Sequence, residues 1–179
     1  NRKLGELAIT DELTGVHNVR HFRQRHAVEH QRSKRFRRPY AIVFLDLDHF
    51  KQFNDRNGHP AGDALLAALA KKLKEISRET DCLARYGGEE FVILAPETDE
   101  AQAGDFAERL RKAVEELPFP NSASQPLGRI SVSIGVASFP ASGKSPEAVL
   151  QAADQAMYHS KKSGRNRVSL FSGITLSVP

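Results

Sequence analysis

The sequence predicts an α+β domain in which a largely antiparallel sheet is covered by helices. Three observations support this prediction. Short β-prone runs alternate with longer amphipathic segments, two of the runs are separated only by a pair of glycines, and 179 residues suit one domain with a substantial core. The hydrophobic content of 40% and the charged content of 27% are those of an ordinary globular protein.

The first elements are two helices and a strand. Residues 2–9 have apolar side chains at helical spacing and resemble the end of a helix arriving from upstream, and residues 18–35 predict a polar helix. Residues 41–47 form an apolar run too short for a lone helix and too continuous for a half-exposed strand, which predicts a buried central strand. Residues 60–77 predict an amphipathic helix, because one face carries Leu65, Leu66, Leu69, Leu73 and Ile76.

A hairpin and four further elements complete the prediction. The run CLARYGGEEFVILA, residues 82–95, predicts two strands joined by a two-residue loop at Gly87 and Gly88. The remaining segments predict a helix at 99–117, a strand with one buried face at 129–137, a helix opened by a Ser-Pro pair at 146–162, and a last strand at 167–171.

Composition excludes some classes of protein and favours others. A single cysteine, Cys82, excludes an intrachain disulfide, and no apolar run approaches the roughly 18 residues of a membrane helix. There is no signal peptide and the first residue is Asn1, so we expect the chain to be a piece of a longer protein. The net charge of +4 fits an anionic ligand.

Acidic residues gather where two of the predicted strands end. Asp46 and Asp48 follow the buried strand, and Glu89 and Glu90 stand at the hairpin tip. If the hairpin packs beside that strand, Asp46 and Glu89 meet at one sheet edge, where two carboxylates repel unless a cation such as Mg²⁺ lies between them. Taken alone, the glycines fit an ordinary turn, the glutamates a solvated rim, and either aspartate a helix cap.

Two polar segments could bind a nucleotide. In DHFKQFNDRNGHPAGDALL, residues 48–66, Asn54 and Asp63 could read the edge of a purine, and Lys51 is a cation near the proposed metal. The alternative is an ordinary helix-loop-helix. In HSKKSGRNRV, residues 159–168, phosphates could be held by Lys161, Lys162 and Arg165. The alternative is a solvated helix C-terminus with cations that suit its dipole.

Seven motifs in order resemble one family. Together they resemble the diguanylate cyclase (GGDEF) family in its GGEEF variant. The motifs are DELTGVHN, FLDLDHFKQFND, GH with GD, RYGGEEF, VSIGVA, AADQAMY and SKKSGRN. The resemblance covers residues 10–171 and leaves 1–9 as the end of an upstream signalling helix or linker and 172–179 as a tail. It implies a five-stranded sheet like the polymerase palm and nucleotidyl cyclase fold, and the condensation of two GTP into cyclic di-GMP and two pyrophosphates.

The resemblance also implies a role for individual residues. Asp46 and Glu89 resemble the metal-binding carboxylates, with the backbone carbonyl of Leu47 as a further ligand, for Mg²⁺ or alternatively Mn²⁺. Glu89 is the candidate base for the 3′-hydroxyl, Lys51 would stabilise the transition state, and Glu90 belongs to the same catalytic group. The nucleotide would be held at the guanine by Asn54 and Asp63, with His59 in the matching nucleotide loop. The backbone from Leu47 to Phe50, which includes Asp48 and His49, would wrap the triphosphate, and Lys161 and Arg165 would contact the phosphates.

A regulatory site is implied as well. RETD, Arg78 to Asp81, has the spacing and register of the family's inhibitory site for cyclic di-GMP, and Arg109 matches a residue that completes this site from a neighbouring domain. By itself, Arg-x-x-Asp is commonly a solvated salt bridge. The family further implies an active homodimer, an upstream sensory domain, and a cytoplasmic location with anchoring only through regions beyond this chain.

Departures and rival interpretations complete the sequence-based hypothesis. Glu89 stands where the family name has Asp, which keeps the ligand type, and Val19 stands where Arg is usual, which we expect to spare catalysis. An inactive module that binds GTP or cyclic di-GMP is the main alternative. We expect no nucleic-acid binding, because no RNP-like run appears. His26 and His30 have zinc-compatible spacing but are expected on a solvated face, as is RSKRFRR, residues 32–38.

Overall fold

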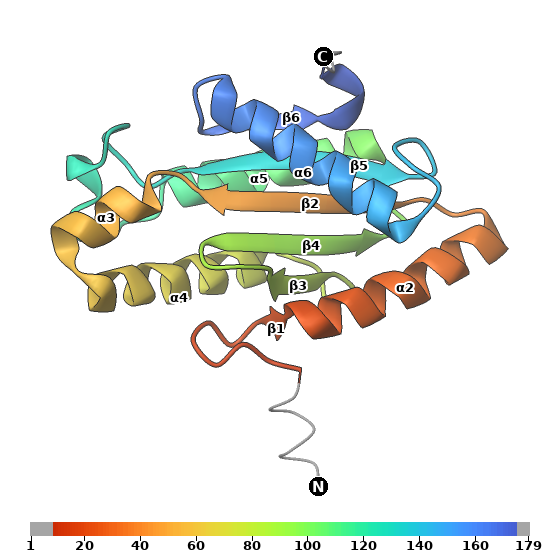
Figure 1. Ribbon diagram of the computed structural model, residues 1–179, viewed down its shortest axis with the longest axis horizontal. Helices are drawn as coiled ribbons and strands as arrows, with labels where there is room; N and C mark the ends of the chain where they lie inside the picture. Colours follow the sequence, from red (N-terminus) through yellow and green to blue (C-terminus); the bar gives the residue numbers. More distant parts are fainter. Residues whose placement is uncertain (1–8, 175–179) are drawn as a thin grey trace, which may run out of the picture.

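A six-stranded sheet lies between two layers of helices in the computed structural model, which describes residues 9–174 (Figure 1). The predicted α+β class is confirmed. The helix expected at 2–9 and the end of the expected tail, 175–179, lie outside the described residues. Within the described range, no helix combines the length and the apolar character needed to cross a membrane.

The sheet has the strand order β1-β3-β4-β2-β5-β6. β2 pairs antiparallel with β4 and β5, and β3 pairs antiparallel with β4. The edge strand β1 pairs in parallel with β3, and the edge strand β6 pairs in parallel with β5. Five of the strands were predicted, whereas the two-residue edge strand is too short for any periodicity to show. The bounds are β1 His17–Asn18, β2 Tyr40–Leu47, β3 Cys82–Arg85, β4 Glu90–Pro96, β5 Val132–Phe139 and β6 Arg167–Leu170.

The described residues form five α-helices, and four of them were predicted. The fifth, α3, appeared only in the alternative of a helix-loop-helix at 48–66; it buries only Phe53, so its sequence carries no apolar stripe. Side-chain caps fix the starts of three others, for example Ser145, whose hydroxyl accepts from the N–H of Ala148 ahead of a proline at the first turn. The bounds are α2 Val19–Phe36, α3 Phe50–Asn57, α4 His59–Ile76, α5 Glu100–Glu115 and α6 Pro146–Lys162, with single 3₁₀ turns at Ser122–Ser124 and Phe171–Gly173.

The core is divided in two by the sheet. α4 and α5 pack on one face and α2 and α6 on the other (Figure 1). β2 contributes alternately to both halves, since Val43 and Leu45 face α4 and α5 whereas Ile42 and Phe44 face α2 and α6. The prediction of a buried central strand is therefore confirmed, and the end of β2 is held firmly from both sides.

β5 is buried on both faces, and the prediction of one buried face was wrong. The second face carries small residues, which the alternation of large apolar residues does not reveal. At Gly135 the backbone of α6 comes so close that an added Cβ would lie 2.1 Å from the carbonyl oxygen of Ala153. Small side chains here let α6 pack directly on the sheet.

The hairpin loop is longer than predicted. β3 ends at Arg85 and β4 starts at Glu90, so four residues separate the strands instead of two. Neither Gly87 nor Gly88 has the positive φ that the predicted tight turn requires. The loop is closed instead by the Arg85 guanidinium, which donates to the carbonyl oxygens of Gly87 at 3.2 Å and Gly88 at 2.8 Å.

His26 and His30 are buried, and the expected solvated face was wrong for them. His26 Nε2 and His30 Nδ1 each lie 3.0 Å from the hydroxyl oxygen of the fully buried Tyr40. Burial, followed by the neighbouring His30, lowers the pKa of His26 to about 4. The 32–38 segment, by contrast, is mostly exposed at the end of α2, as expected.

We therefore expect the free energy of unfolding to fall as pH drops from about 6.5 to about 4. The unfolded chain protonates His26 near its ordinary pKa of 6.5 and the folded chain only near 4, so acid favours the unfolded state. His26 alone accounts for about 3 kcal/mol, at ~1.4 kcal/mol per pH unit. Urea unfolding across this range should show a smaller pH dependence for His26→Gln, with the exposed His159→Gln as control. Equal pH dependence in His26→Gln and the parent protein would contradict this assignment.

Candidate active site

The predicted meeting of the hairpin tip with the end of β2 is present. β2 and β4 pair so that Asp46 lies opposite Glu90, and the N–H of Leu47 donates to the carbonyl oxygen of Glu89 at 3.2 Å. α3 follows directly from β2, so the hairpin loop and α3 lie at the same end of the sheet (Figure 1). This pairing brings together Asp46, Glu89 and Glu90 at one end of the sheet, where β2 finishes and β4 begins.

Asp46 is a buried carboxylate in a cluster of negative charge. Its side chain is 6% exposed, and burial raises its pKa to about 6, with smaller contributions in the same direction from Glu89 and Glu90. Burial also raises the pKa of Glu90. Lys161 Nζ lies 2.8 Å from Asp46 Oδ2 and opposes both shifts. Three carboxylates around this one ammonium group leave an excess of negative charge, which suits a further cation.

The side chain of Asp48 makes internal polar contacts that the sequence did not predict. Its carboxylate accepts from the hydroxyls of Ser131 at 2.7 Å and Ser133 at 2.6 Å, and from the N–H of Asn166 at 3.0 Å. Its own N–H donates to the carbonyl oxygen of Ser131. With these groups engaged inside the protein, Asp48 joins β2 to β5 and to the segment after α6, and its place along the triphosphate stays a prediction.

The start of α3 offers backbone donors beside the acidic cluster. His49 has φ of 56°, a left-handed conformation that turns the chain sharply from β2 into the helix that begins at Phe50. The first N–H groups of a helix have no acceptor within the helix and favour anions. Lys51 lies exposed in this first turn. The geometry therefore suits a phosphate group lying over the predicted segment His49–Phe50.

Asn54 is held against the first turn of α4 with an unused polar atom. Its Oδ1 is buried and has no hydrogen-bond partner within the described part of the chain. A Cβ at Gly62 would lie 1.7 Å from this atom, so only glycine permits this contact. Asp63 follows Gly62, and its side chain is exposed, as is that of His59. Gly62, from the GD motif, is a positioning residue that the sequence-based hypothesis did not assign.

The segment after α6 brings its cations to the same end of the sheet. Arg165, at φ of 65°, lies close enough to His49 to help lower the pKa of that imidazole, although burial is the larger cause. Lys161 contacts Asp46 directly, whereas the resemblance placed it at a phosphate. Asn166 was missed from the sequence because its role is internal: besides binding Asp48, it donates to Glu115 at 2.6 Å.

The predicted inhibitory pair lies at the opposite side of the domain core from the hairpin tip, after the end of α4. Asp81 Oδ2 accepts from the N–H of Arg78 at 2.8 Å, and burial raises the pKa of Asp81. Both residues line a cavity of ≈ 400 Å³ and also a crevice against Phe106 of α5. Arg109 is exposed one turn further along α5, with its guanidinium 5.6 Å from the Phe106 ring centre.

Residues 8–167 match the family described as "Diguanylate cyclase, GGDEF domain". The chain is 40% identical over 163 residues to the response regulator PleD of Caulobacter vibrioides, which covers 91% of this chain and 36% of the relative. It is 37% identical over 174 residues to diguanylate cyclase A of Treponema denticola, covering 95% of this chain and 46% of the relative. The chain thus spans less than half the length of these two relatives.

Solved structures show the same similarity. The GGDEF domain of DgcB from Caulobacter crescentus in complex with c-di-GMP superposes with a TM-score of 0.85 at 33% identity, covering 93% of this chain and 97% of that one. The active GGEEF domain of a diguanylate cyclase from Vibrio cholerae superposes with a TM-score of 0.78 at 32% identity, covering 86% and 96%. That domain shares the GGEEF spelling of the hairpin tip found here.

Proposed function

Since the chain belongs to the diguanylate cyclase GGDEF-domain family, we propose that it condenses two GTP molecules into cyclic di-GMP and two pyrophosphates. The observation that carries this proposal is the buried Asp46 beside Glu89 and Glu90, with Lys161 as its paired cation. A purely structural ion pair would need only one carboxylate for the ammonium group, whereas a site that receives a metal-bound triphosphate needs additional carboxylates to bind the metal.

Oxygen donors around Asp46 fit a small divalent cation. The carboxylates of Asp46 and Glu89 and the carbonyl of Leu47 are hard ligands of the kind that Mg²⁺ takes together with substrate phosphates, and Mn²⁺ accepts the same set. When bound, such an ion lowers the pKa of the attacking hydroxyl and offsets charge that develops at the α-phosphate. Lys161 would then leave Asp46 for a phosphate oxygen, because the metal ion would balance the negative charge of Asp46 that Lys161 balances now.

The nucleotide would lie from the hairpin tip across α3. The triphosphate fits over the backbone of His49–Phe50, with Lys51 and Arg165 as cations. Guanine fits against Asn54 and Asp63. Asn54 Oδ1, for which the described residues provide no hydrogen-bond partner, can accept a donor of the base. His59 would line the same nucleotide loop.

The reaction forms two phosphodiester bonds. The 3′-oxygen of one GTP bonds to the α-phosphorus of the second, the bond to pyrophosphate breaks, and the hydroxyl proton passes to Glu89. Repetition in the other direction closes the ring. Because one domain is proposed to bind one GTP, two domains must face each other, which requires a homodimer.

Regulation and location follow from the same proposal. A further solved structure similar to this chain is that of diguanylate cyclase SiaD in complex with its activator SiaC from Pseudomonas aeruginosa. We place an upstream sensory region before the present chain, and the reaction in the cytoplasm, where GTP is available. Product inhibition would act at Arg78 and Asp81.

The proposal is tested by incubation with GTP and Mg²⁺, followed by chromatography and mass spectrometry of the products. Parallel reactions should use the chain alone and the chain fused to a dimerising coiled coil. We expect cyclic di-GMP and two pyrophosphates per product, with faster turnover in the fusion. Binding of GTP without product in both proteins would favour the inactive binding module instead.

Arg78→Ala should abolish tight binding of cyclic di-GMP while initial GTP turnover stays within about twofold. The guanidinium is exposed between the cavity and the α5 crevice and can bind phosphate or stack on a purine. We expect a loss of about 10²-fold in affinity, of the order of a charged hydrogen-bonding pair. Calorimetry measures the affinity for cyclic di-GMP, and progress curves measure the initial rate of GTP turnover.

The matched control for this variant is Arg35→Ala, because Arg35 is an exposed arginine at the end of α2 and does not line the cavity. It should retain both product affinity and the slowing of the progress curve. Undiminished affinity in Arg78→Ala, or a fall in its initial rate comparable to loss of a metal ligand, would contradict the regulatory assignment.

A further inference from the structure

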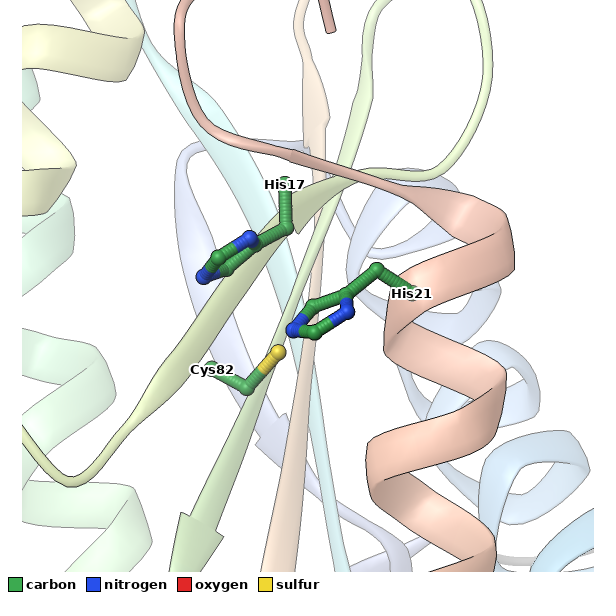
Figure 2. A group of neighbouring side chains, drawn as sticks. All are labelled: His17, His21 and Cys82. Atoms are coloured by element: carbon green, nitrogen blue, oxygen red, sulfur yellow. The ribbon is translucent and has the colours of Figure 1, made fainter. Parts of the chain in front are cut away.

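Three potential metal ligands meet at the β1 edge of the sheet. The imidazole nitrogens of His17 and His21 and the Sγ of Cys82 offer one ligand atom each, and these atoms all lie within 4.8 Å of one another. Figure 2 shows the His21 ring and the Cys82 sulfur facing each other, with the His17 ring beside them; the three side chains come from β1, α2 and β3. We propose that His17, His21 and Cys82 form a binding site for a thiophilic divalent cation, Zn²⁺, separate from the proposed Mg²⁺ site.

Strand register and a helix cap bring these residues together. β1 pairs in parallel with β3 so that His17 lies beside Ala84. Ala84 and Cys82 are two residues apart and therefore point to the same face, toward α2. Asn18 caps α2 through the N–H of His21 at 2.9 Å, which fixes the first turn of the helix above Cys82. Backbone geometry thus holds all three side chains on one face.

The donor set selects zinc over magnesium. Two imidazoles and one thiolate are borderline-to-soft ligands, whereas Mg²⁺ prefers oxygen. Zn–N bonds of about 2.1 Å and Zn–S bonds of about 2.3 Å place tetrahedral ligand atoms roughly 3.5 Å apart. Because both imidazoles are only half-buried, small rotations can close the present spacing. Three protein ligands leave a fourth position for water or another small ligand.

The backbone orients one of the two imidazole ligands. His17 has a hydrogen bond with the backbone of Ile9, the kind of second contact that orients a metal-binding imidazole. Burial is the main cause that lowers the pKa values of His17 and His21. Burial raises the pKa of the Cys82 thiol to about 11, with a smaller opposing contribution from Arg25. On binding, a Zn–S bond forms and the thiol proton leaves to solvent.

A bound ion would add a crosslink where β1 pairs with β3 over only two residues. It would link the turn of residues 9–18 to the first turn of α2 and to β3. Cys82 directly follows Asp81, and His17 lines the ≈ 400 Å³ cavity that also contains Arg78 and Asp81. The site therefore lies beside the predicted inhibitory pair, at the place where the chain leads into the sheet.

Cobalt substitution tests the site without depending on catalysis. Untagged protein in excess Mg²⁺ is titrated with Co²⁺, and we expect one equivalent to give a thiolate-to-cobalt charge-transfer band that Zn²⁺ removes. Cys82→Ser should abolish the band, and His17→Gln and His21→Gln should each weaken cobalt affinity by about 10-fold or more. Asp46→Asn and the exposed His159→Gln should retain it.

Thermal unfolding gives a second measurement. Zn²⁺ at about 100 times its dissociation constant should raise the Tm of the parent by roughly 5–10 °C and leave Cys82→Ser unchanged. Absence of the band in the parent, or its persistence in Cys82→Ser, would overturn the proposal. So would equal cobalt affinity in the parent and both histidine variants, since a lone thiolate would then be the ligand.

Discussion

Glu89→Gln is expected to lower the rate of cyclic di-GMP formation by at least ~10³-fold while the domain stays folded. The substitution keeps size and shape but removes a charge from the cluster around Asp46, where metal affinity depends on carboxylates. Loss of such electrostatic stabilisation of a transition state costs about 4 kcal/mol, which is on the order of 10³-fold in rate. Initial rates of product formation at saturating GTP measure the effect.

Glu97→Gln is the matched control, because Glu97 is an exposed glutamate beyond the other end of β4 that pairs with Arg32. It should leave the rate unchanged. Circular dichroism of both variants checks that the fold persists. If Glu89→Gln produced cyclic di-GMP at the parental rate, the carboxylate cluster at the hairpin tip would not be the metal site.

The candidate site was largely predictable because it depends on strand order and register. A buried run ending in Asp46 and a hairpin ending in Glu89 and Glu90 already suggested that their tips meet, and the pairing of Asp46 with Glu90 agrees. The family motifs strengthened this prediction. Periodicity likewise predicted the large helices and five strands, since each carries an apolar face that must be buried.

The missed features are those in which side chains make internal polar contacts. Nothing in the pattern around Asp48 separates a carboxylate that binds Ser131 and Ser133 from one that faces a ligand. The same holds for His26 and His30, each of which has one ring nitrogen 3.0 Å from the Tyr40 hydroxyl. Such contacts require the three-dimensional arrangement of α2 against β2.

Close backbone approaches were missed for a related reason. Glycine at 62 or 135 looks unremarkable in a helix or a strand, yet at each position an added Cβ would require a neighbour to move. At Gly62 the neighbour is the Asn54 side chain, and at Gly135 it is the backbone of α6. The site at His17, His21 and Cys82 was also invisible in sequence, because its residues are distant along the chain and one lies on a two-residue strand.

The parent protein should use GTP in preference to ATP by on the order of 10³-fold, and Asp63→Ala should remove most of this preference. A carboxylate at Asp63 can accept from both the N1–H and the amino group of guanine, a pair of donors that adenine lacks. Sites that hydrogen-bond a base through buried groups discriminate by 10⁴–10⁵. Asp63 is exposed until a base covers it, so a smaller ratio is expected here.

Competition between the two nucleotides, read as the ratio of their kcat/KM values, measures this preference in the parent and the variant. Asp55→Ala is the control, because Asp55 is an exposed aspartate next to Asn54 on α3. Asp63→Ala should lose GTP turnover with little change for ATP, since only guanine loses an acceptor. Gly62→Ala should have a similar effect by displacing Asn54, whose Oδ1 occupies the space of the added Cβ. Equal use of GTP and ATP by the parent protein would show that neither Asn54 nor Asp63 reads the base.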